Sequence, residues 1–267
     1  MQYTPETERF RGFLIIDKKE KCFINLQPKN FNLESTTVWS FPDRGNYATH
    51  SGKYRGNWSP YVPRNLILRY SNSSDWVLDP FMGGGTTLVE AKLLNRNAVG
   101  VDINPQSVSI SEINLQFQCE TNSKIFTRIG NATDLYFMKD NRIDFICTHP
   151  PYANIIQYSK GIEGDLSLLQ VEDFLVRMKK VAEECFRVLK KGKICAVMIG
   201  DIRKYGRVIP LGFRMMECFL QTGFINKEII IKKQHNCYST TYWEKQNPSF
   251  LLLAHEYIFV FQKQMDL

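Results

Sequence analysis

The sequence predicts an α/β fold built on a mostly parallel sheet. From about Asp75 onward, short apolar runs alternate with helical patterns, as expected for parallel strands joined by crossover helices. The last two apolar runs flank an irregular polar loop, which indicates an antiparallel pair that closes the sheet. With 267 residues and 43% apolar content, the chain is large enough to bury a substantial core.

Seven strands are expected from the apolar runs. The first strand ends at an aspartate followed by proline, and the second also ends at an acid. The third is a short strand that runs into a loop. In chain order, the expected strands span residues 75–80, 98–105, 129–135, 143–147, 194–201, 224–233 and 255–263.

Four helices are expected between these strands, at residues 85–97, 105–120, 170–193 and 210–223. The helix at 170–193 is strongly amphipathic and is expected to stop at Gly192. Its expected apolar stripe consists of Phe174, Met178, Val181, Cys185 and Val188. The helix at 210–223 has proline at its start and glycine after its end, which are the usual preferences at helix termini.

The first part of the chain differs from the rest. Gly, Asn, Arg and aromatic residues crowd residues 40–65, which predicts a loop-rich segment. We expect residues 1–57 to pack as a substrate-facing flap on the sheet domain, residues 58–267, and not to fold alone.

The net charge of +7 and the isoelectric point near 9.0 favour a polyanionic partner, because neutralising phosphates releases counterions. A basic surface without such a partner is the alternative. No apolar run reaches the ~18–20 residues that a membrane span needs, and charged residues near the N-terminus disfavour a secretory signal.

Cysteine and histidine usage indicates a cytoplasmic protein without a metal. The seven cysteines have no repeated spacing and no C-x-x-C pair, so they read as reduced thiols. The four histidines show no pattern of zinc ligands.

A glycine turn follows the first expected strand in the stretch "VLDPFMGGGTTLVEA". Its glycines let the backbone approach a ligand closely and leave the N–H groups at the helix start free. No Gly-Lys-Ser/Thr follows, so it is not a phosphate loop, and the spacing is not that of the GxGxxG dinucleotide motif. An ordinary structural turn is the alternative.

Acids at three successive strand ends strengthen the case for a ligand. Asp79 and Asp102 end the first two expected strands, and Asp134 stands at the expected end of the third. An acid at the position of Asp102 can accept both ribose hydroxyls of a nucleoside, although it can also cap the next helix. Asp134 could accept from an adenine amino group. The three acids fit an adenosine ligand without a phosphate.

The stretch "IDFICTHPPYANIIQYS" begins as a buried strand and stops at two prolines. Neither proline has an N–H to donate to a sheet ladder, so the strand must end there. His149 and Tyr152 are therefore expected on a rigid, extended corner.

Asp79 to Thr87 and His149 to Tyr152 together resemble the S-adenosylmethionine-dependent DNA amino-methyltransferases, which methylate N6 of adenine or N4 of cytosine. The first stretch matches their D-P-F-x-G-x-G-T-T motif residue for residue. The second matches their [Asp/Asn/Ser]-Pro-Pro-[Tyr/Phe/Trp] motif at three of four positions. The resemblance covers roughly residues 58–263. It implies a Rossmann-like class I methyltransferase fold, whose mostly parallel seven-stranded sheet has an antiparallel terminal strand.

The resemblance also implies a cofactor, S-adenosylmethionine, and no metal. The catalytic domain would be residues 58–267, and residues 57–71 resemble the segment that contributes to the methionine pocket. The implied cofactor residues are Trp58, Ser59, Asp79, Pro80, Phe81, Gly83, Gly85, Thr86, Asp102, Ile103 and Asp134.

The implied catalytic residues are His149, Pro150, Pro151 and Tyr152. In the family, the first side chain and the carbonyl of the first proline accept the two hydrogens of the target amine, and the prolines fix that geometry. Tyr152 would stack on a base flipped out of the duplex.

His149 departs from the family pattern. A neutral imidazole can accept one hydrogen bond, but an imidazolium can accept none. We therefore expect activity to fall as the pH drops through the pKa of this histidine, within the range 8 to 5.5. In the alternatives, His149 is a structural residue while Thr148 or a backbone carbonyl accepts, or the site is inactive.

Only about sixty residues separate the two motifs, so target recognition must come from the N-terminal third and from residues 232–250. Both segments interleave basic and aromatic residues, as nucleic-acid contacts require. The candidate contacts are Arg44, Lys53, Arg55, Lys233 and Tyr242.

The expected partner is double-stranded DNA, with a restriction endonuclease or a second methyltransferase subunit as candidate protein partners, and no membrane. An RNA base methyltransferase and a non-catalytic nucleic-acid-binding subunit are the alternatives. His149, like serine, is an uncharged acceptor, which slightly favours cytosine over adenine.

Overall fold

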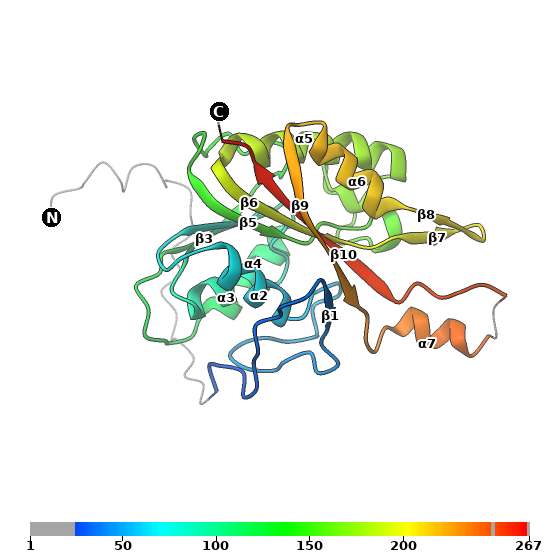
Figure 1. Ribbon diagram of the computed structural model, residues 1–267, viewed down its shortest axis with the longest axis horizontal. Helices are drawn as coiled ribbons and strands as arrows, with labels where there is room; N and C mark the ends of the chain where they lie inside the picture. The colour runs from blue at the N-terminus through cyan, green and yellow to red at the C-terminus, as the bar shows by residue number, and fades with distance from the viewer. Residues whose placement is uncertain (1–24, 247–248, 266–267) are drawn as a thin grey trace, which may run out of the picture.

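A computed structural model describes residues 25–246 and 249–265, so residues 1–24 of the expected flap lie outside it. Within the described residues, an eight-stranded sheet forms the centre of the molecule (Figure 1). The strands are β1 (Val38–Ser40), β2 (Trp76–Asp79), β3 (Asn97–Asp102), β4 (Ile125–Ile129), β5 (Ile143–Thr148), β6 (Leu189–Ile199), β9 (Phe224–Lys233) and β10 (His255–Lys263).

The strand order is β1-β9-β10-β6-β5-β2-β3-β4. Only β10 is antiparallel to its described neighbours, β6 and β9, and the other pairs are parallel. The expected mostly parallel sheet with an antiparallel terminal strand is confirmed. β1, from the segment expected to be loop-rich, adds an eighth strand beside β9.

Helices cover both faces of the sheet. Because side chains alternate along a strand, Phe145 and Cys147 of β5 pack on one face and Ile146 on the other. The first face carries α2 (Tyr61–Tyr70), α3 (Thr86–Leu93) and α4 (Pro105–Leu115), and the second carries α5 (Val171–Val188) and α6 (Leu211–Leu220). The expected stripe of α5 is buried along its whole length. In the described part of the chain, no helix has the length and apolar character needed to traverse a bilayer.

The third strand lies earlier than expected. β4 spans Ile125–Ile129 and pairs with β3 from Ala98 to Asp102. Residues 130–135 form a loop instead, because Gly130 and Asn131 turn the chain as soon as the pairing with β3 ends. This shift moves Asp134 away from the strand end.

The helix expected to stop at Gly192 ends four residues earlier, at Val188. Leu189 is already in β6, where it pairs with Ile143. The buried ammonium group of Lys263 donates to the carbonyls of Phe186 and Leu189, at 2.6 and 2.8 Å. A side chain from β10 therefore satisfies the end of this helix, and no glycine cap is needed.

Two projecting elements were not expected. A ribbon made of β7 (Ile202–Lys204) and β8 (Arg207–Ile209) follows β6, and α7 (Tyr238–Glu244) lies between β9 and β10. Both project on the right of Figure 1.

The N-terminal segment is fixed to the sheet domain by a buried carboxylate. Glu90 on α3 is fully buried and accepts hydrogen bonds from Tyr47 and His50 of the segment, at 2.7 and 2.6 Å. Arg64 on α2 donates to its second oxygen at 3.0 Å. The segment is therefore held by a charged contact that is inaccessible to solvent.

Replacing Glu90 with alanine should destabilise the protein strongly. The substitution leaves Arg64 buried without its counter-charge, and breaking a buried pair costs about 3–5 kcal/mol. The free energy of unfolding, measured with urea, checks this. The matched control is Glu183→Ala on the exposed face of α5, expected to change stability by less than about 0.5 kcal/mol. Equal effects of the two substitutions would contradict the role of Glu90.

Candidate active site

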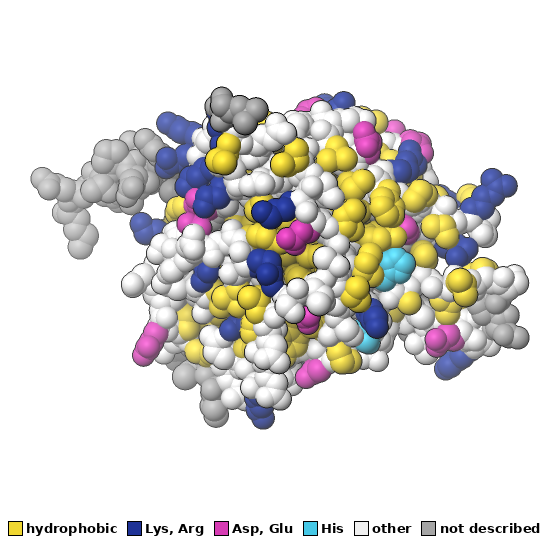
Figure 2. Space-filling model, viewed as in Figure 1, with side chains coloured by type: hydrophobic (Ala, Val, Ile, Leu, Met, Phe, Trp, Pro, Cys, Tyr) yellow, Lys and Arg dark blue, Asp and Glu magenta, His cyan; other side chains and the backbone are white. Residues whose placement is uncertain are grey.

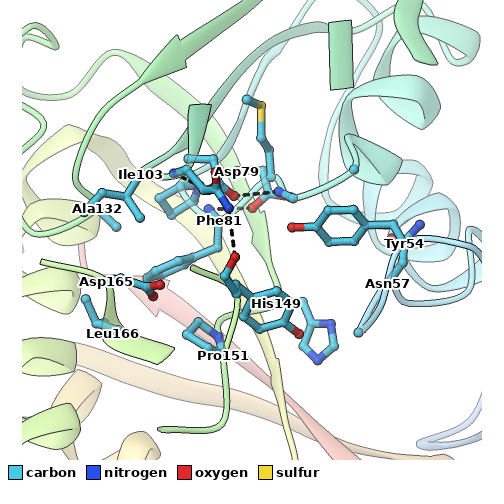
Figure 3. A pocket seen from close by; sticks show the side chains of 18 of the residues that line it. Tyr54, Asn57, Asp79, Phe81, Ile103, Ala132, His149, Pro151, Asp165 and Leu166 are labelled. Atoms are coloured by element: carbon cyan, nitrogen blue, oxygen red, sulfur yellow. Dashed lines mark hydrogen bonds between the residues drawn. The ribbon is translucent and has the colours of Figure 1, made fainter. Parts of the chain in front are cut away.

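Loops at the carboxyl ends of β2, β3, β4 and β5 surround a narrow cavity (Figure 3). Open α/β sheets bind ligands at this edge. The expected site residues that line the cavity are Trp58, Asp79, Pro80, Phe81, Gly83, Asp102, Ile103, His149 and Pro151. The fold therefore brings the glycine turn and the proline corner together, although they are far apart in the sequence.

Asp79 joins the turn to the corner. Its carboxylate accepts hydrogen bonds from the hydroxyl of Thr87 at 2.5 Å and the hydroxyl of Thr148 at 2.7 Å. The backbone N–H of Phe81 also donates to it, at 3.0 Å. Burial raises the pKa of Asp79 to about 6, although these three donors act in the opposite direction. Because the Thr148 hydroxyl is buried and already donates to Asp79, Thr148 is poorly placed to accept a hydrogen from a substrate.

Asp102 is anchored by backbone at the end of β3. The N–H of Gly83 and the N–H of Asn104 each donate to one of its carboxylate oxygens, at 3.0 and 2.9 Å. Burial raises the pKa of Asp102 to about 6, against the effect of these donors. Asp102 is not the cap of α4, which was its alternative role. The cap is Asn104, whose side chain accepts from the N–H of Gln106 at the start of α4. Asp102 therefore keeps lone pairs available to a ligand in the cavity.

The flap covers the glycine turn with an aromatic ring. A Cβ on Gly83, whose φ is +49°, would lie 3.0 Å from the ring of Tyr54, so that ring packs directly on the turn. Tyr54 in turn lies parallel to the ring of Tyr158, with centroids 6.3 Å apart. Tyr54, from the N-terminal segment, therefore covers one side of the cavity.

Two residues of the motif act on neighbouring groups and do not line the cavity. Gly85 has a φ of +84°, and a Cβ there would collide with Ser111 on α4, so glycine permits the close approach of α3 and α4. The hydroxyl of Thr86 donates to the side-chain oxygen of Asn57 at 2.5 Å, and Asn57 lines the cavity.

Asp134 lies outside the cavity, contrary to expectation. It is exposed, and its carboxylate accepts from the N–H of Tyr136 in its own loop. Because β4 ends at Ile129, the residues that reach the cavity from this loop are Asn131 and Ala132.

His149 lies between two aromatic rings at the corner that follows β5. The indole of Trp58 stacks on its imidazole with centroids 5.4 Å apart and planes 21° apart. Its Nε2 is 3.0 Å from the hydroxyl of Tyr152. Burial lowers the pKa of His149 to about 4, although nearby Glu256 acts in the opposite direction. The ring is therefore neutral over the physiological range of pH.

A wider cleft opens beyond His149. It shares Gly56, Asn57, Trp58, His149 and Tyr158 with the narrow cavity. The remaining expected residues Ser59, Pro150 and Tyr152 line this cleft and not the cavity. Its far wall comes from β7, α7 and the loop before β10, including Arg203, Trp243 and Phe250. His149 therefore stands where the two spaces meet.

The candidate nucleic-acid contacts differ in their surroundings. Arg44 lines the cleft, but its guanidinium donates to the carbonyls of Asn57 and Trp58, both at 2.7 Å. Because these hydrogen bonds use its donors, Arg44 shapes the flap and has fewer donors for a phosphate. The other candidates, Lys53, Arg55, Lys233 and Tyr242, are exposed on elements that border the cleft. Figure 2 shows Lys and Arg side chains spread over one face, both at its edges and near its centre, and not gathered into a single patch.

Sequence reasoning missed the part of the cavity that comes from loops. The missed residues are Tyr54, Gly56, Asn57, Met82, Gly84, Asn104, Asn131, Ala132, Tyr158, Gly164, Asp165 and Leu166. One of these loops has a sequence signal. In "GDLSL", before α5, Asp165 caps the short helical turn at Leu166–Leu168 and so holds Leu166 in place, and an aspartate before such a turn is a typical capping residue.

A family model described as DNA methylase matches residues 11–112 and 143–266, which is most of the chain. A second model, described as an RMKL-like methyltransferase domain, matches residues 68–197. A SAM-dependent methyltransferase structure from Methanosarcina mazei has a TM-score of 0.52 at 15% identity, and the match covers 75% of this chain and 98% of that one. The fold is thus the α/β fold of SAM-dependent methyltransferases.

The curated relatives include methyltransferases of two kinds. Type II methyltransferase M2.DpnII of Streptococcus pneumoniae is 29% identical over 123 residues, 45% of this chain and 46% of that protein. A tRNA (guanine(10)-N2)-dimethyltransferase of Methanothermobacter thermautotrophicus is 36% identical over 123 residues, 46% of this chain and 34% of that protein. The match spans less than half the length of each of the first relatives found.

Replacing Thr148 with valine should destabilise the protein in a pH-dependent way. The substitution removes a donor to the Asp79 carboxylate, and a hydrogen bond to a charged group contributes about 1.5–3 kcal/mol. The loss should be largest at pH 8, where Asp79 is ionised, and smaller at pH 5, below its pKa of about 6. Urea unfolding at both pH values measures it, with Thr37→Val at an exposed position as the control. A loss of the same size at both pH values would contradict the assignment.

Proposed function

The chain belongs to the DNA methylase family, and on this basis we propose that it methylates the exocyclic amino group of a DNA base. The methyl donor is S-adenosylmethionine, and the target is N4 of cytosine or N6 of adenine in a base flipped out of duplex DNA. The observation that carries the proposal is the position of His149 on the boundary shared by the narrow cavity and the wide cleft, which gives donor and base adjacent spaces.

The residues around the cavity fit this cofactor. Asp102 has lone pairs for ribose hydroxyls, and the glycine turn under Tyr54 leaves room that a Cβ would fill. Phe81, Ile103 and Leu166 supply apolar walls suited to an adenine ring. Bound there, S-adenosylmethionine would supply an electrophilic methyl group.

The residues of the corner fit the other half of the reaction. An exocyclic amine on an aromatic base is a poor nucleophile, because its lone pair is delocalised into the ring. Acceptance of its two hydrogens by His149 and by the carbonyl of Pro150 favours a tetrahedral nitrogen whose lone pair points toward the cavity. The ring of Tyr152 lines the cleft beside them, where a flipped base would stack.

A tRNA substrate is the second candidate. It is favoured by the match to the tRNA (guanine(10)-N2)-dimethyltransferase, which acts on an exocyclic amine too and is 36% identical over its matched stretch. A wide cleft bordered by exposed basic residues suits either nucleic acid.

The first test supplies the purified protein with methyl-labelled S-adenosylmethionine and either unmethylated genomic DNA or bulk tRNA. Nucleosides from each digest are identified by mass spectrometry. We expect N4-methylcytosine or N6-methyladenine in DNA, and His149→Ala should lower the rate by about 10²–10³-fold, as the loss of a preorganised hydrogen bond does. The Glu183→Ala variant serves as the control. Label found only in tRNA would replace the proposal by the second candidate.

The kcat and the KM for S-adenosylmethionine should depend on pH in different ways. Since His149 has a pKa of about 4, it stays neutral above pH 5.5. In place of the fall in activity expected from the sequence, we therefore expect a kcat that is constant between pH 8 and 5.5. Asp102 is protonated below about pH 6, so KM for S-adenosylmethionine should rise by up to about tenfold per pH unit below that value. Steady-state kinetics at saturating DNA measure both. A kcat that halves near pH 6.5 in the wild type but not in the His149→Asn variant would show that His149 titrates as an ordinary histidine.

A further inference from the structure

A chain of hydrogen bonds runs from His149 across the floor of the wide cleft. Nε2 of His149 is 3.0 Å from the Tyr152 hydroxyl, which lies 2.8 Å from one carboxylate oxygen of Glu256 on β10. Lys232 on β9 donates to the other oxygen of Glu256 at 2.9 Å. Three separate elements thus meet behind the imidazole, and we call this set of four side chains the relay.

The protons of the relay can be placed by elimination. Burial alone would raise the pKa of Glu256, but the charge of Lys232 and the hydrogen bonds from Lys232 and Tyr152 hold it below its usual value, so the group is a carboxylate and only accepts. Burial and Glu256 raise the pKa of Tyr152 well above its usual value, so its one hydroxyl proton is retained. That proton is used in the bond to Glu256.

The tyrosine oxygen can then only accept from the histidine. Nε2 of His149 must carry its proton, and in a neutral ring the other nitrogen, Nδ1, is bare. Among the described residues, no hydrogen bond to Nδ1 is formed. Other charged groups at the cleft are engaged elsewhere, since Asp201 accepts from the N–H of Gly212 at 3.0 Å.

We propose that Lys232, Glu256 and Tyr152 fix His149 as the Nε2–H tautomer, so that Nδ1 accepts a hydrogen of the target amine. This rests on the proposed function for the identity of the amine. Lys232 and Glu256 are positioning residues, because they act through Tyr152 and need not touch the substrate. Gly200 leaves room for the Tyr152 ring, since a Cβ there would lie 3.1 Å from it.

The tautomer itself is measured by nitrogen-15 NMR of histidine-labelled protein at pH 7. The chain has four histidines, and the His149→Asn variant identifies the signals of His149. We expect a protonated Nε2 and a bare Nδ1. A protonated Nδ1 or an imidazolium would overturn the proposal. No substrate is needed, so this result stands even if neither nucleic acid is methylated and the proposed function fails.

Glu256→Gln tests the direction of the relay. With Lys232 still bound to the amide oxygen, the amide N–H₂ group faces Tyr152, which reverses the chain and moves the histidine proton to Nδ1. We expect this shift in the NMR spectrum and a loss of kcat of about a hundredfold, with KM for S-adenosylmethionine unchanged.

The double variant Lys232→Met/Glu256→Gln frees the amide to turn its oxygen toward Tyr152, and part of kcat should return. The matched control is Glu228→Gln on β9, which removes the carboxylate that accepts from Tyr70 at 2.6 Å away from the cleft. It should leave kcat and the tautomer unchanged. A Glu256→Gln variant that is folded and keeps the Nε2–H tautomer would overturn the proposal.

Discussion

The buried carboxylate of Asp79 is the contact on which the site depends. It accepts from Thr87 at the start of α3 and from Thr148 at the end of β5, so the glycine turn and the end of β5 are both bound to one group. Burial of an ion is tolerated only when its lone pairs are satisfied, and three donors satisfy them here. The glycine turn and the Pro-Pro corner are therefore held at a fixed position relative to each other by hydrogen bonds that neither motif predicts on its own.

The N-terminal segment depends on a second buried carboxylate, that of Glu90 on α3. Glu90, on the same helix as Thr87, binds Tyr47, His50 and Arg64, which sets the path of the chain as it returns toward the sheet. That path carries Tyr54 over the glycine turn and Trp58 onto the imidazole of His149. The lid of the cavity is thus an extension of the α3 packing, and the segment acts as part of the sheet domain.

The sequence predicted the elements whose signal is local. β9 and β10 have the expected bounds, and the motif residues Asp79, Asp102 and His149 meet as the order of parallel strands requires. The errors arose where distant partners decide the outcome. Lys263 caps α5 from another strand, and the pairing of β4 with β3 displaced Asp134. Periodicity and composition contain no information on such contacts.

Histidine at the first position of the corner imposes demands that Asp, Asn or Ser would not. A carboxylate accepts at either oxygen, but an imidazole accepts only when it is neutral and only at the nitrogen without a proton. Burial between Trp58 and Tyr152 keeps the ring neutral, and the hydroxyl of Tyr152 can select the nitrogen because Glu256 orders it. A site that uses this residue needs a partner behind Nε2, whereas serine would need none. The joint presence of Tyr152, Glu256 and Lys232 is therefore best understood as a consequence of the histidine. Because the histidine has its own requirements, its likeness to serine as an uncharged acceptor no longer identifies the base as cytosine or adenine.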